Sequence, residues 1–249
     1  MTGTAYTALV AVQIVLAVVV FFALLHIDAP YGRFVRPGWG PTIPSRVGWI
    51  LMEAPASVWF LAVYALGEHR GQIVPLVMLA LWQIHYVNRA FVTPFLTRSS
   101  RRMPVAVAAM AFCFNLLNGW INARWVSALG DYPVTWLADP RFILGVLVMA
   151  AGFVLNVRSD AILRALRRSH DGYVLPDRGP FRVITSPNYA GEILEWIGWA
   201  ILTWSPAGLA FAVFTFANLA PRALATRRWY AETFPDFPTG RKALIPGVI

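Results

Sequence analysis

The chain has 249 residues, of which 58% are hydrophobic and 13% charged. A soluble domain carries about a quarter charged residues, so the composition excludes an ordinary soluble protein and predicts an all-α integral membrane protein. The formal net charge is +9. The single cysteine, Cys113, excludes a disulfide within the chain and a zinc cluster of cysteines. It lies in an apolar run, and we expect it to be a small buried packing residue.

Seven apolar segments are candidate transmembrane helices, each of which needs about 20 apolar residues to cross a bilayer. In chain order they cover residues 6–25, 47–66, 73–95, 105–125, 142–155, 189–204 and 207–219. The last two are short, and Ser205-Pro206 between them permits a helical hairpin. No basic residue precedes the first segment, so we interpret it as a retained span and not as a signal peptide. The sequence predicts one polytopic domain over residues 1–249.

Basic residues gather in alternate loops, after the first, third, fifth and seventh segments. Because cytoplasmic loops carry the excess of Lys and Arg, the N-terminus is predicted outside and the C-terminus in the cytoplasm. The alternation also supports an odd number of spans. Lys242 is the single lysine among 21 basic residues, and an Arg-rich chain of this kind favours a bacterial inner membrane over the endoplasmic reticulum.

Two polar stretches are predicted to cover the cytoplasmic mouth of the helices. Residues 158–187 form the longest polar loop, and its first part, 160–168, has helical periodicity and continues the fifth segment inward. Residues 230–249 form a second polar tail with three prolines. We expect loops and short helices there, above a cofactor cavity.

Ionisable or polar residues occur in four of the segments, always toward the predicted cytoplasmic end. A charge in mid-membrane costs about 2.5–3.5 kcal/mol on the insertion scale, so their shared depth predicts one polar cavity open to the cytosol. The residues concerned are Glu53, His85, Tyr86, Asn88, Arg89, Asn156, Glu192 and Glu195. Asn188, Glu192 and Glu195 follow at helical spacings at the start of the sixth segment.

Several of these residues allow a structural as well as a functional interpretation. Glu53 either pairs with Arg89 or is a carboxyl group kept protonated by apolar surroundings, able to donate a hydrogen bond or a proton. Tyr86 is either a core aromatic residue or a hydrogen-bond donor to a ligand. His85 and Arg89 are expected to be structural partners that line the cavity. Glu195 is expected to pair with a nearby arginine, and no metal site is predicted because the four histidines are scattered.

The arginines suggest a phosphorylated ligand, because a guanidinium group can bind phosphate oxygens in a forked geometry. Asp160, Arg164, Arg167 and Arg168 share one helical face, and Arg178, Arg222, Arg227 and Arg228 lie on the same predicted side of the membrane. Neither Gly-x-Gly-x-x-Gly nor Gly-x-x-x-x-Gly-Lys-Ser/Thr occurs. A nucleotide would therefore be held by side chains. Nucleic acid is not expected, since the basic loops are short and carry no reading motif.

The C-terminal half resembles the steroid 5α-reductase family of membrane NADPH-dependent reductases. The resemblance is carried by residues 156–167, 173–181, 188–200, 221–223, 227–230 and 237–246, with Glu53-Ala-Pro55 and residues 85–91 in the N-terminal half. It implies that residues 1–130 form mainly the substrate side and 131–249 mainly the NADPH-binding half. The implied cofactor-binding residues are Asn156, Asp160, Arg167, Tyr173, Asn188, Glu192, Arg222 and Tyr230, with Arg98 and Arg101 as additions. Met52 and Val174 depart from the family pattern, and Arg178 is expected to compensate for Val174.

The resemblance also implies the reaction. Glu53 and Tyr86 match the pair that holds a substrate 3-ketone, so we expect NADPH-dependent reduction of the C4=C5 double bond of a 3-oxo-Δ4 steroid or related lipid enone. The enone would enter from the bilayer and NADPH from the cytosol. The alternative is an isoprenylcysteine-type membrane methyltransferase that uses S-adenosylmethionine. A transporter is disfavoured, because transporters commonly contain internal repeats and none is visible here.

Overall fold

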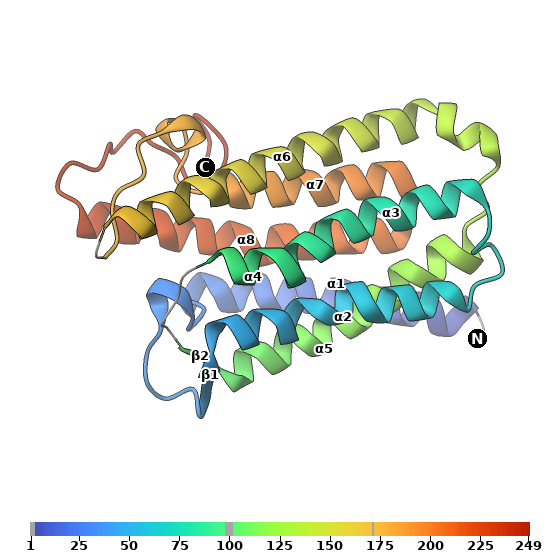
Figure 1. The fold of residues 1–249 in the computed structure, drawn as a ribbon, viewed down its shortest axis with the longest axis horizontal. Coiled ribbons are helices and arrows are strands. Elements are labelled where there is room, and N and C mark those ends of the chain that lie inside the picture. The colour runs from blue at the N-terminus through green and yellow to red at the C-terminus, as the bar shows by residue number, and fades with distance from the viewer. Residues whose placement is uncertain (1–2, 98–101, 171) are drawn as a thin grey trace.

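The computed structural model describes residues 3–97, 102–170 and 172–249, and most of them lie in helices that run along the long axis of the molecule (Figure 1). The elements, in chain order, are α1 (Gly3–His26), β1 (Thr42–Pro44), α2 (Ser45–Ala65), α3 (Ile73–Val87), α4 (Thr93–Leu96), β2 (Arg102–Pro104), α5 (Val105–Arg124), α6 (Pro140–Ser169), α7 (Pro187–Thr203) and α8 (Pro206–Thr233). Long helices that follow one another in the chain run in alternating directions. The end at which α1 finishes and α2 begins carries the arginine-rich loops, and we call it the basic end (left in Figure 1).

Five of the described helical segments are long and apolar enough to cross a membrane: α1, α2, α5 with the turn that follows it, α6 and α8. The predicted class, an all-α membrane protein, is therefore confirmed, but the predicted number of seven spans is not. Helix α3 has 15 residues and α7 has 17, so the prediction that they also span stays a prediction. The two strands were not expected. They have three residues each and pair antiparallel, with Ile43 opposite Met103.

The third predicted segment is continuous but not uniformly α-helical. Helix α3 passes into a π-helical turn, Asn88–Val92, and then into α4, whose second residue is Pro94. A π turn inserts one extra residue into the helical ladder and is frequent at functional sites. Here it carries Arg89 toward the interior of the molecule.

One predicted boundary was wrong. The last segment was expected to end at Leu219, yet α8 is 28 residues long and ends at Thr233. Proline is tolerated in membrane helices, where neighbouring groups can satisfy the freed carbonyl, and Pro221 is buried here. Helix α6 is 30 residues long and contains the predicted inward extension at 160–168.

Helices α6 and α7 pack with their backbones in direct contact. Gly145 and Gly152 of α6 face Gly191 and Gly198 of α7, and a Cβ atom at any of the four would meet backbone atoms of the other helix. Small residues at such positions let membrane helices approach closely. The pair therefore forms one tightly packed unit (Figure 1).

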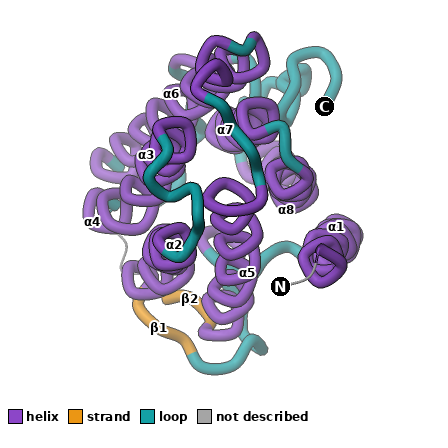
Figure 2. Tube along the Cα trace, turned by 90° about the vertical axis from the view of Figure 1, so that its right-hand side faces the viewer, coloured by secondary structure: helices purple, strands orange, loops and turns teal. Residues whose placement is uncertain are grey.

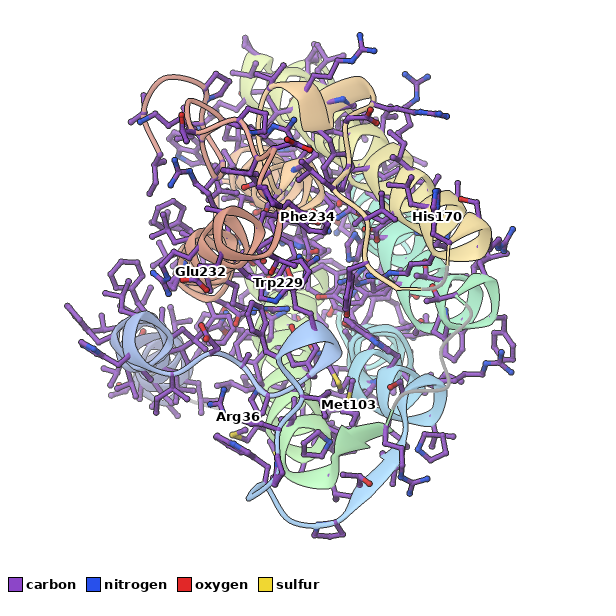
Figure 3. All side chains as sticks on the ribbon, turned by 90° about the vertical axis from the view of Figure 1, so that its left-hand side faces the viewer. Arg36, Met103, His170, Trp229, Glu232 and Phe234 are labelled. Atoms are coloured by element: carbon purple, nitrogen blue, oxygen red, sulfur yellow. The ribbon has the colours of Figure 1, made fainter. Side chains whose placement is uncertain are left out.

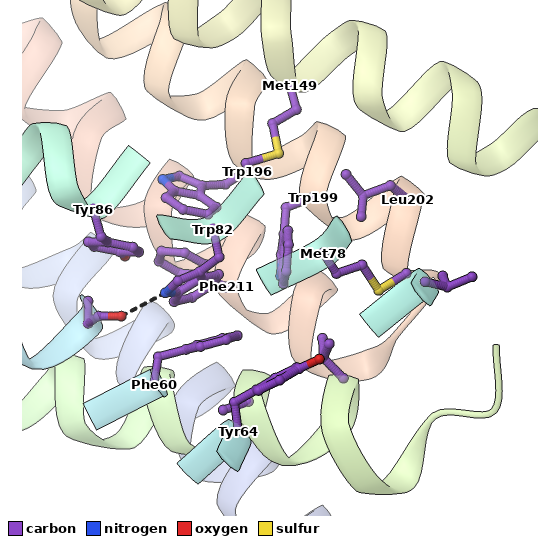
Figure 4. Close-up of a cluster of buried hydrophobic side chains, with 14 of the residues drawn as sticks. Phe60, Tyr64, Met78, Trp82, Tyr86, Met149, Trp196, Trp199, Leu202 and Phe211 are labelled. Carbon is purple, nitrogen blue, oxygen red and sulfur yellow. Dashed lines mark hydrogen bonds between the residues drawn. The ribbon is translucent and has the colours of Figure 1, made fainter. Parts of the chain in front are cut away.

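An aromatic core fills the space between α2, α3, α7 and α8. Trp82, Trp196 and Phe211 lie within 6 Å of one another by ring centroid. The Trp82 indole donates a 2.7 Å hydrogen bond to the Ala56 carbonyl, as Figure 4 shows. This core closes the bundle below the polar cavity.

Helix α1 lies at the side of the bundle, against α8 and α5 (Figure 2). Its buried residues are Tyr6, Gln13 and Ala17. The expectation that Cys113 is buried was wrong, because the side chain is exposed on α5. In a membrane protein an exposed apolar helix face contacts lipid, so apolar surroundings in the sequence did not imply burial in protein.

Candidate active site

One cavity of about 1230 Å³ occupies the basic half of the molecule. Figure 3 views that end, with Trp229 of α8 near the middle of the view and His170, at the end of α6, on the right. The wall has two chemically different parts. Side chains of α1, α5 and α8, such as Leu16, Met110 and Phe214, form an apolar part. The other part, from α2, the π turn, α6 and α7, is polar and charged.

Arg89 is the centre of the polar part. Its guanidinium group lies 3.7 Å from a Glu53 oxygen, 3.4 Å from Asp160 and 3.6 Å from Glu192. The ring of Trp49 packs against it, with the guanidinium carbon 4.9 Å from the centroid. All three carboxyl groups are largely buried. Three acidic groups thus share one guanidinium, and charge balance favours a proton on at least one of them.

Asn156 and Asn188 connect the acidic groups of α6 and α7. The Asn156 amide donates to the Asn188 carbonyl at 2.9 Å and lies 3.5 Å from Glu192. The Asn188 amide donates to Asp160 at 3.2 Å. Asn156 is buried beneath the cavity wall and orients the groups that line it.

Glu53 and Tyr86 both line this cavity, on α2 and α3. Tyr86 is 3% exposed and packs against the rings of Trp82 and Trp196, as Figure 4 shows. Its hydroxyl group makes no hydrogen bond to any residue that the structure describes. Glu53 contacts Arg89 at a distance too long for a strong hydrogen bond. Both interpretations of Glu53, ion pair and ligand-facing acid, are therefore compatible with the geometry.

Arg222 supplies a positive charge without a carboxylate within ion-pair distance in the described chain. Its guanidinium group donates to the Tyr189 hydroxyl at 3.2 Å and lies 4.6 Å above the Tyr31 ring. A cation held by aromatic rings and a hydroxyl group retains its capacity to bind an anion.

Arg33, in the short 3₁₀ turn Gly32–Phe34 after α1, also lines the cavity and was not among the predicted site residues. Its guanidinium carbon lies 5.2, 4.7 and 4.7 Å from the ring centroids of Tyr173, Trp229 and Tyr230. One of its nitrogens, Nη1, is buried and has no hydrogen-bond partner among the described residues. Arg33 and Tyr230 are 197 positions apart in the chain, so no local spacing could have signalled this contact.

The structure brings most of the predicted residues to this cavity. Those that line it are Glu53, Tyr86, Asp160, Arg167, Tyr173, Asn188, Glu192, Arg222 and Tyr230. Arg178 is exposed and is not among the lining residues, and its nearest ionic partner is the exposed Asp177 at 4.0 Å. Arg98 and Arg101 lie outside the described residues. Met52, one of the departures from the family pattern, is buried and contributes to the wall.

Glu195 was expected to pair with an arginine, and this was wrong. Its carboxylate lies 2.9 Å from His85 Nδ1, and both residues are buried. Helix α7 faces α3 at this level, which the helical pattern of α7 alone could not reveal. No group of three or more His, Cys, Asp or Glu side chains in the described part of the chain is arranged to hold a metal ion.

Comparison with known proteins agrees with this architecture. A family profile described as 3-oxo-5-alpha-steroid 4-dehydrogenase matches residues 101–249. Steroid 5-alpha-reductase DET2 of Gossypium hirsutum is 43% identical over 93% of this chain and 93% of its own length. The 3-oxo-5-alpha-steroid 4-dehydrogenase 1 of Bos taurus is 37% identical over 97% and 96%, and that of Homo sapiens 37% over 96% and 93%.

The methyltransferase alternative has no support in these comparisons. The family profile covers more than half of the chain, and the relatives cover nearly all of it at more than a third identity. The chain therefore belongs to the 3-oxo-5-alpha-steroid 4-dehydrogenase family of membrane oxidoreductases, which act on a CH–CH bond.

Proposed function

We propose that the protein reduces the C4=C5 double bond of a 3-oxo-Δ4 steroid, or of a related lipid enone, with NADPH. The observation that carries the proposal is the two-part wall of the cavity. An apolar lipid fits the part built by α1, α5 and α8, and a phosphorylated cofactor fits the arginine-lined mouth. A cavity with an apolar wall and a charged mouth has the size and chemistry of a ligand-binding site, and a packing defect would have neither.

The residues at the mouth fit NADPH by their unpaired donors. Arg33 Nη1 and Ser186 Oγ are buried without a hydrogen-bond partner in the described structure, and both residues line the cavity. Arg222 lacks a carboxylate partner, and Arg164 and Arg167 lie at the rim. Phosphate oxygens would satisfy such donors. The residues that would hold the cofactor are Asn156, Asp160, Arg167, Tyr173, Asn188, Glu192, Arg222 and Tyr230, with Arg33 added. Arg98 and Arg101, which lie outside the described residues, and the exposed Arg178 stay predicted additions.

NADPH would supply the hydride for the β-carbon of the enone. As that carbon is reduced, negative charge develops on the ketone oxygen of the substrate. A protonated Glu53 and the Tyr86 hydroxyl group, both donating to that oxygen, would stabilise the charge as a preorganised oxyanion site. The aromatic rings around Tyr86 exclude water, which strengthens such hydrogen bonds.

The test is NADPH oxidation and formation of the saturated product with a 4-ene-3-one in purified, detergent-solubilised protein. Glu53→Gln replaces the acidic O–H group by a non-acidic amide, and Tyr86→Phe removes a donor outright; loss of one oxyanion donor costs roughly 10²–10³ in kcat. Tyr64→Phe, near the C-terminal end of α2, and Glu68→Gln, in the loop that follows, are controls and are expected to keep wild-type rates. Wild-type rates in both site variants would contradict the assigned roles.

A binding experiment separates the proposed cofactor from that of the rejected methyltransferase. NADPH is expected to raise the unfolding temperature of the protein, because a ligand that binds only the folded state stabilises it. S-adenosylmethionine is expected to leave it unchanged. Stabilisation by S-adenosylmethionine alone would contradict the proposal.

A further inference from the structure

The reduction of an enone needs a proton as well as a hydride, and Glu53 and Tyr86 are already placed at the ketone oxygen. Protonation at that oxygen gives an enol and leaves the α-carbon unsaturated. Asp160 and Glu192 already contact Arg89 and the asparagine amides, and the proposed function assigns both to the cofactor. The α-carbon therefore requires another donor at the cavity wall.

His85 is a buried titratable residue that lines the cavity, and the proposed reduction gives it no role. It precedes Tyr86 in the chain, so the two side chains leave adjacent positions of α3. Its Nδ1 atom donates to Glu195 at 2.9 Å. Its Nε2 atom makes no hydrogen bond to any residue in the described part of the chain.

The environment favours a protonated His85. Glu195 is 1% exposed, and its second oxygen, Oε2, has no partner among the described residues. A neutral imidazole would leave this buried carboxylate uncompensated, which is costly, whereas an imidazolium ion balances it. The hydrogen bond at Nδ1 fixes the ring, so that the second N–H bond of the ion belongs to Nε2.

Aromatic rings surround the imidazole of His85. Tyr86 and Trp196 stand edge-on to the imidazole, with centroids 4.8 and 4.7 Å away, and Phe153 lies at 6.5 Å. Apolar rings on these sides limit the water available for direct protonation of a substrate. A fixed acid is then more effective than solvent.

Building on the proposed function, we propose that the Glu195–His85 pair is the general acid that protonates the α-carbon of the substrate. The hydride from NADPH forms the C–H bond at the β-carbon, and the π electrons of the C=C bond move to give an enolate. The enolate α-carbon then takes the proton from His85 Nε2, whose N–H bond electrons stay on nitrogen. Neutral His85 regains a proton from water entering at the mouth. Glu195 acts through His85 and is a positioning residue.

The experiment compares two isotope effects in wild type and His85→Gln. General acid catalysis contributes roughly 10²–10⁴ in rate, so kcat is expected to fall at least about 10²-fold. Because protonation becomes the slow step, the solvent deuterium isotope effect on kcat should rise. The isotope effect measured with NADPH deuterated at the transferred position should fall toward one. A packing defect would lower kcat without raising the solvent isotope effect and without lowering the isotope effect of deuterated NADPH.

Two further variants complete the test. Glu195→Gln keeps a hydrogen-bond acceptor of nearly the same volume but removes the charge. It should raise the solvent isotope effect and lower that of deuterated NADPH, with a smaller loss of rate than His85→Gln. This variant keeps the proposal testable even if His85→Gln does not fold. His69→Gln is the matched control, since His69 also uses Nδ1 on a single acceptor, the Gly130 carbonyl at 2.9 Å, far from the cavity. It is expected to keep both wild-type isotope effects.

Unchanged isotope effects in both site variants would overturn the role of His85 while leaving the reductase activity intact. Absence of NADPH-dependent enone reduction in the wild type would instead overturn the proposed function, and this proposal with it. The two failures are thus distinguishable.

Discussion

Helix α7 and helix α1 show two ways in which a membrane helix is held in one protein. Nine of the 17 residues of α7 are buried, and its glycines bring its backbone against α6. Only three of the 24 residues of α1 are buried among those described. Helix α7 carries Asn188, Glu192 and Glu195, whereas α1 contributes apolar wall. Five polar residues of the site lie on the tightly packed α6–α7 pair: Asn156, Asp160, Asn188, Glu192 and Glu195. Helix α1 bears none of the predicted site residues.

The largest loss of stability is expected from Gly152→Leu, which would force α6 away from α7. The added side chain would meet the backbone of Glu195 and Gly191, which cannot move aside as a flexible side chain could. We expect a loss of more than about 4 kcal/mol, the range that marks severe packing defects. Thermal unfolding and the yield of monodisperse protein in detergent measure the effect. Ala151→Leu, at the exposed neighbouring position, should be tolerated, and equal damage by both changes would contradict the model of backbone contact.

The second prediction concerns the Arg89 guanidinium group, which contacts carboxyl groups of α2, α6 and α7. Arg89→Met leaves Glu53, Asp160 and Glu192 without their shared cation, and removal of one partner of a buried ion pair costs about 3–5 kcal/mol. We expect a lower unfolding temperature and loss of activity, with no effect from Arg158→Met on the exposed face of α6. Adding Asp160→Asn to Arg89→Met should recover part of the stability, because one uncompensated carboxylate is removed. A strictly additive double variant would show that the charges are not coupled.

A smaller effect is expected in α1. Gln13 donates to Asn118 Oδ1 at 3.1 Å, inside the bundle, and hydrogen bonds between membrane helices average about 0.6 kcal/mol, with a maximum near 1.7. Gln13→Leu should therefore lower stability only slightly in a thermal unfolding series. Val12→Leu, on the exposed face, is the control. A loss as large as that of Gly152→Leu would mean that α1 is held as firmly as α7.

The smallest effect is expected at the start of α6, outside the membrane segments. The side-chain hydrogen bonds from Arg141 hold the pKa of Asp139 at about 2, below its ordinary value of 3.8. A carboxyl group with a lowered pKa in the folded state adds stability above the ordinary value, and this is lost as pH falls toward 2. The wild type should lose slightly more stability than Asp139→Asn across that window, and parallel pH curves would contradict the assignment.

Much of the candidate site followed from the sequence, because the cost of charge in a membrane is a strong constraint. Glu53, Arg89 and Glu192 lie at one depth in the sequence pattern, and Asp160 was expected beside them only from the family resemblance; all four line one cavity in the structure. Their pairing within the cavity followed less well. The partner of Glu195 is His85 and not an arginine, since the facing of two helices depends on packing that neither helix encodes alone.

The parts that could not be predicted depend on contacts between distant segments. Arg33 meets Tyr173, Trp229 and Tyr230 only after the whole bundle has formed. The π turn at Arg89 and the β1–β2 pair have no local signature in composition or periodicity. The length of α8 was underestimated because its apolar run ends near Leu219, whereas the helix continues through the buried Pro221 into polar residues.

The length of α6 has a consequence for the membrane that surrounds the protein. Its 30 residues extend about 45 Å at 1.5 Å per residue, whereas the hydrocarbon layer is about 30 Å thick. A hydrocarbon layer that begins at the first residue of α6 would end near Asp160, which would put the acidic groups around Arg89 at the level of the lipid headgroups. The thickness of the host bilayer would then control how much water reaches that cluster.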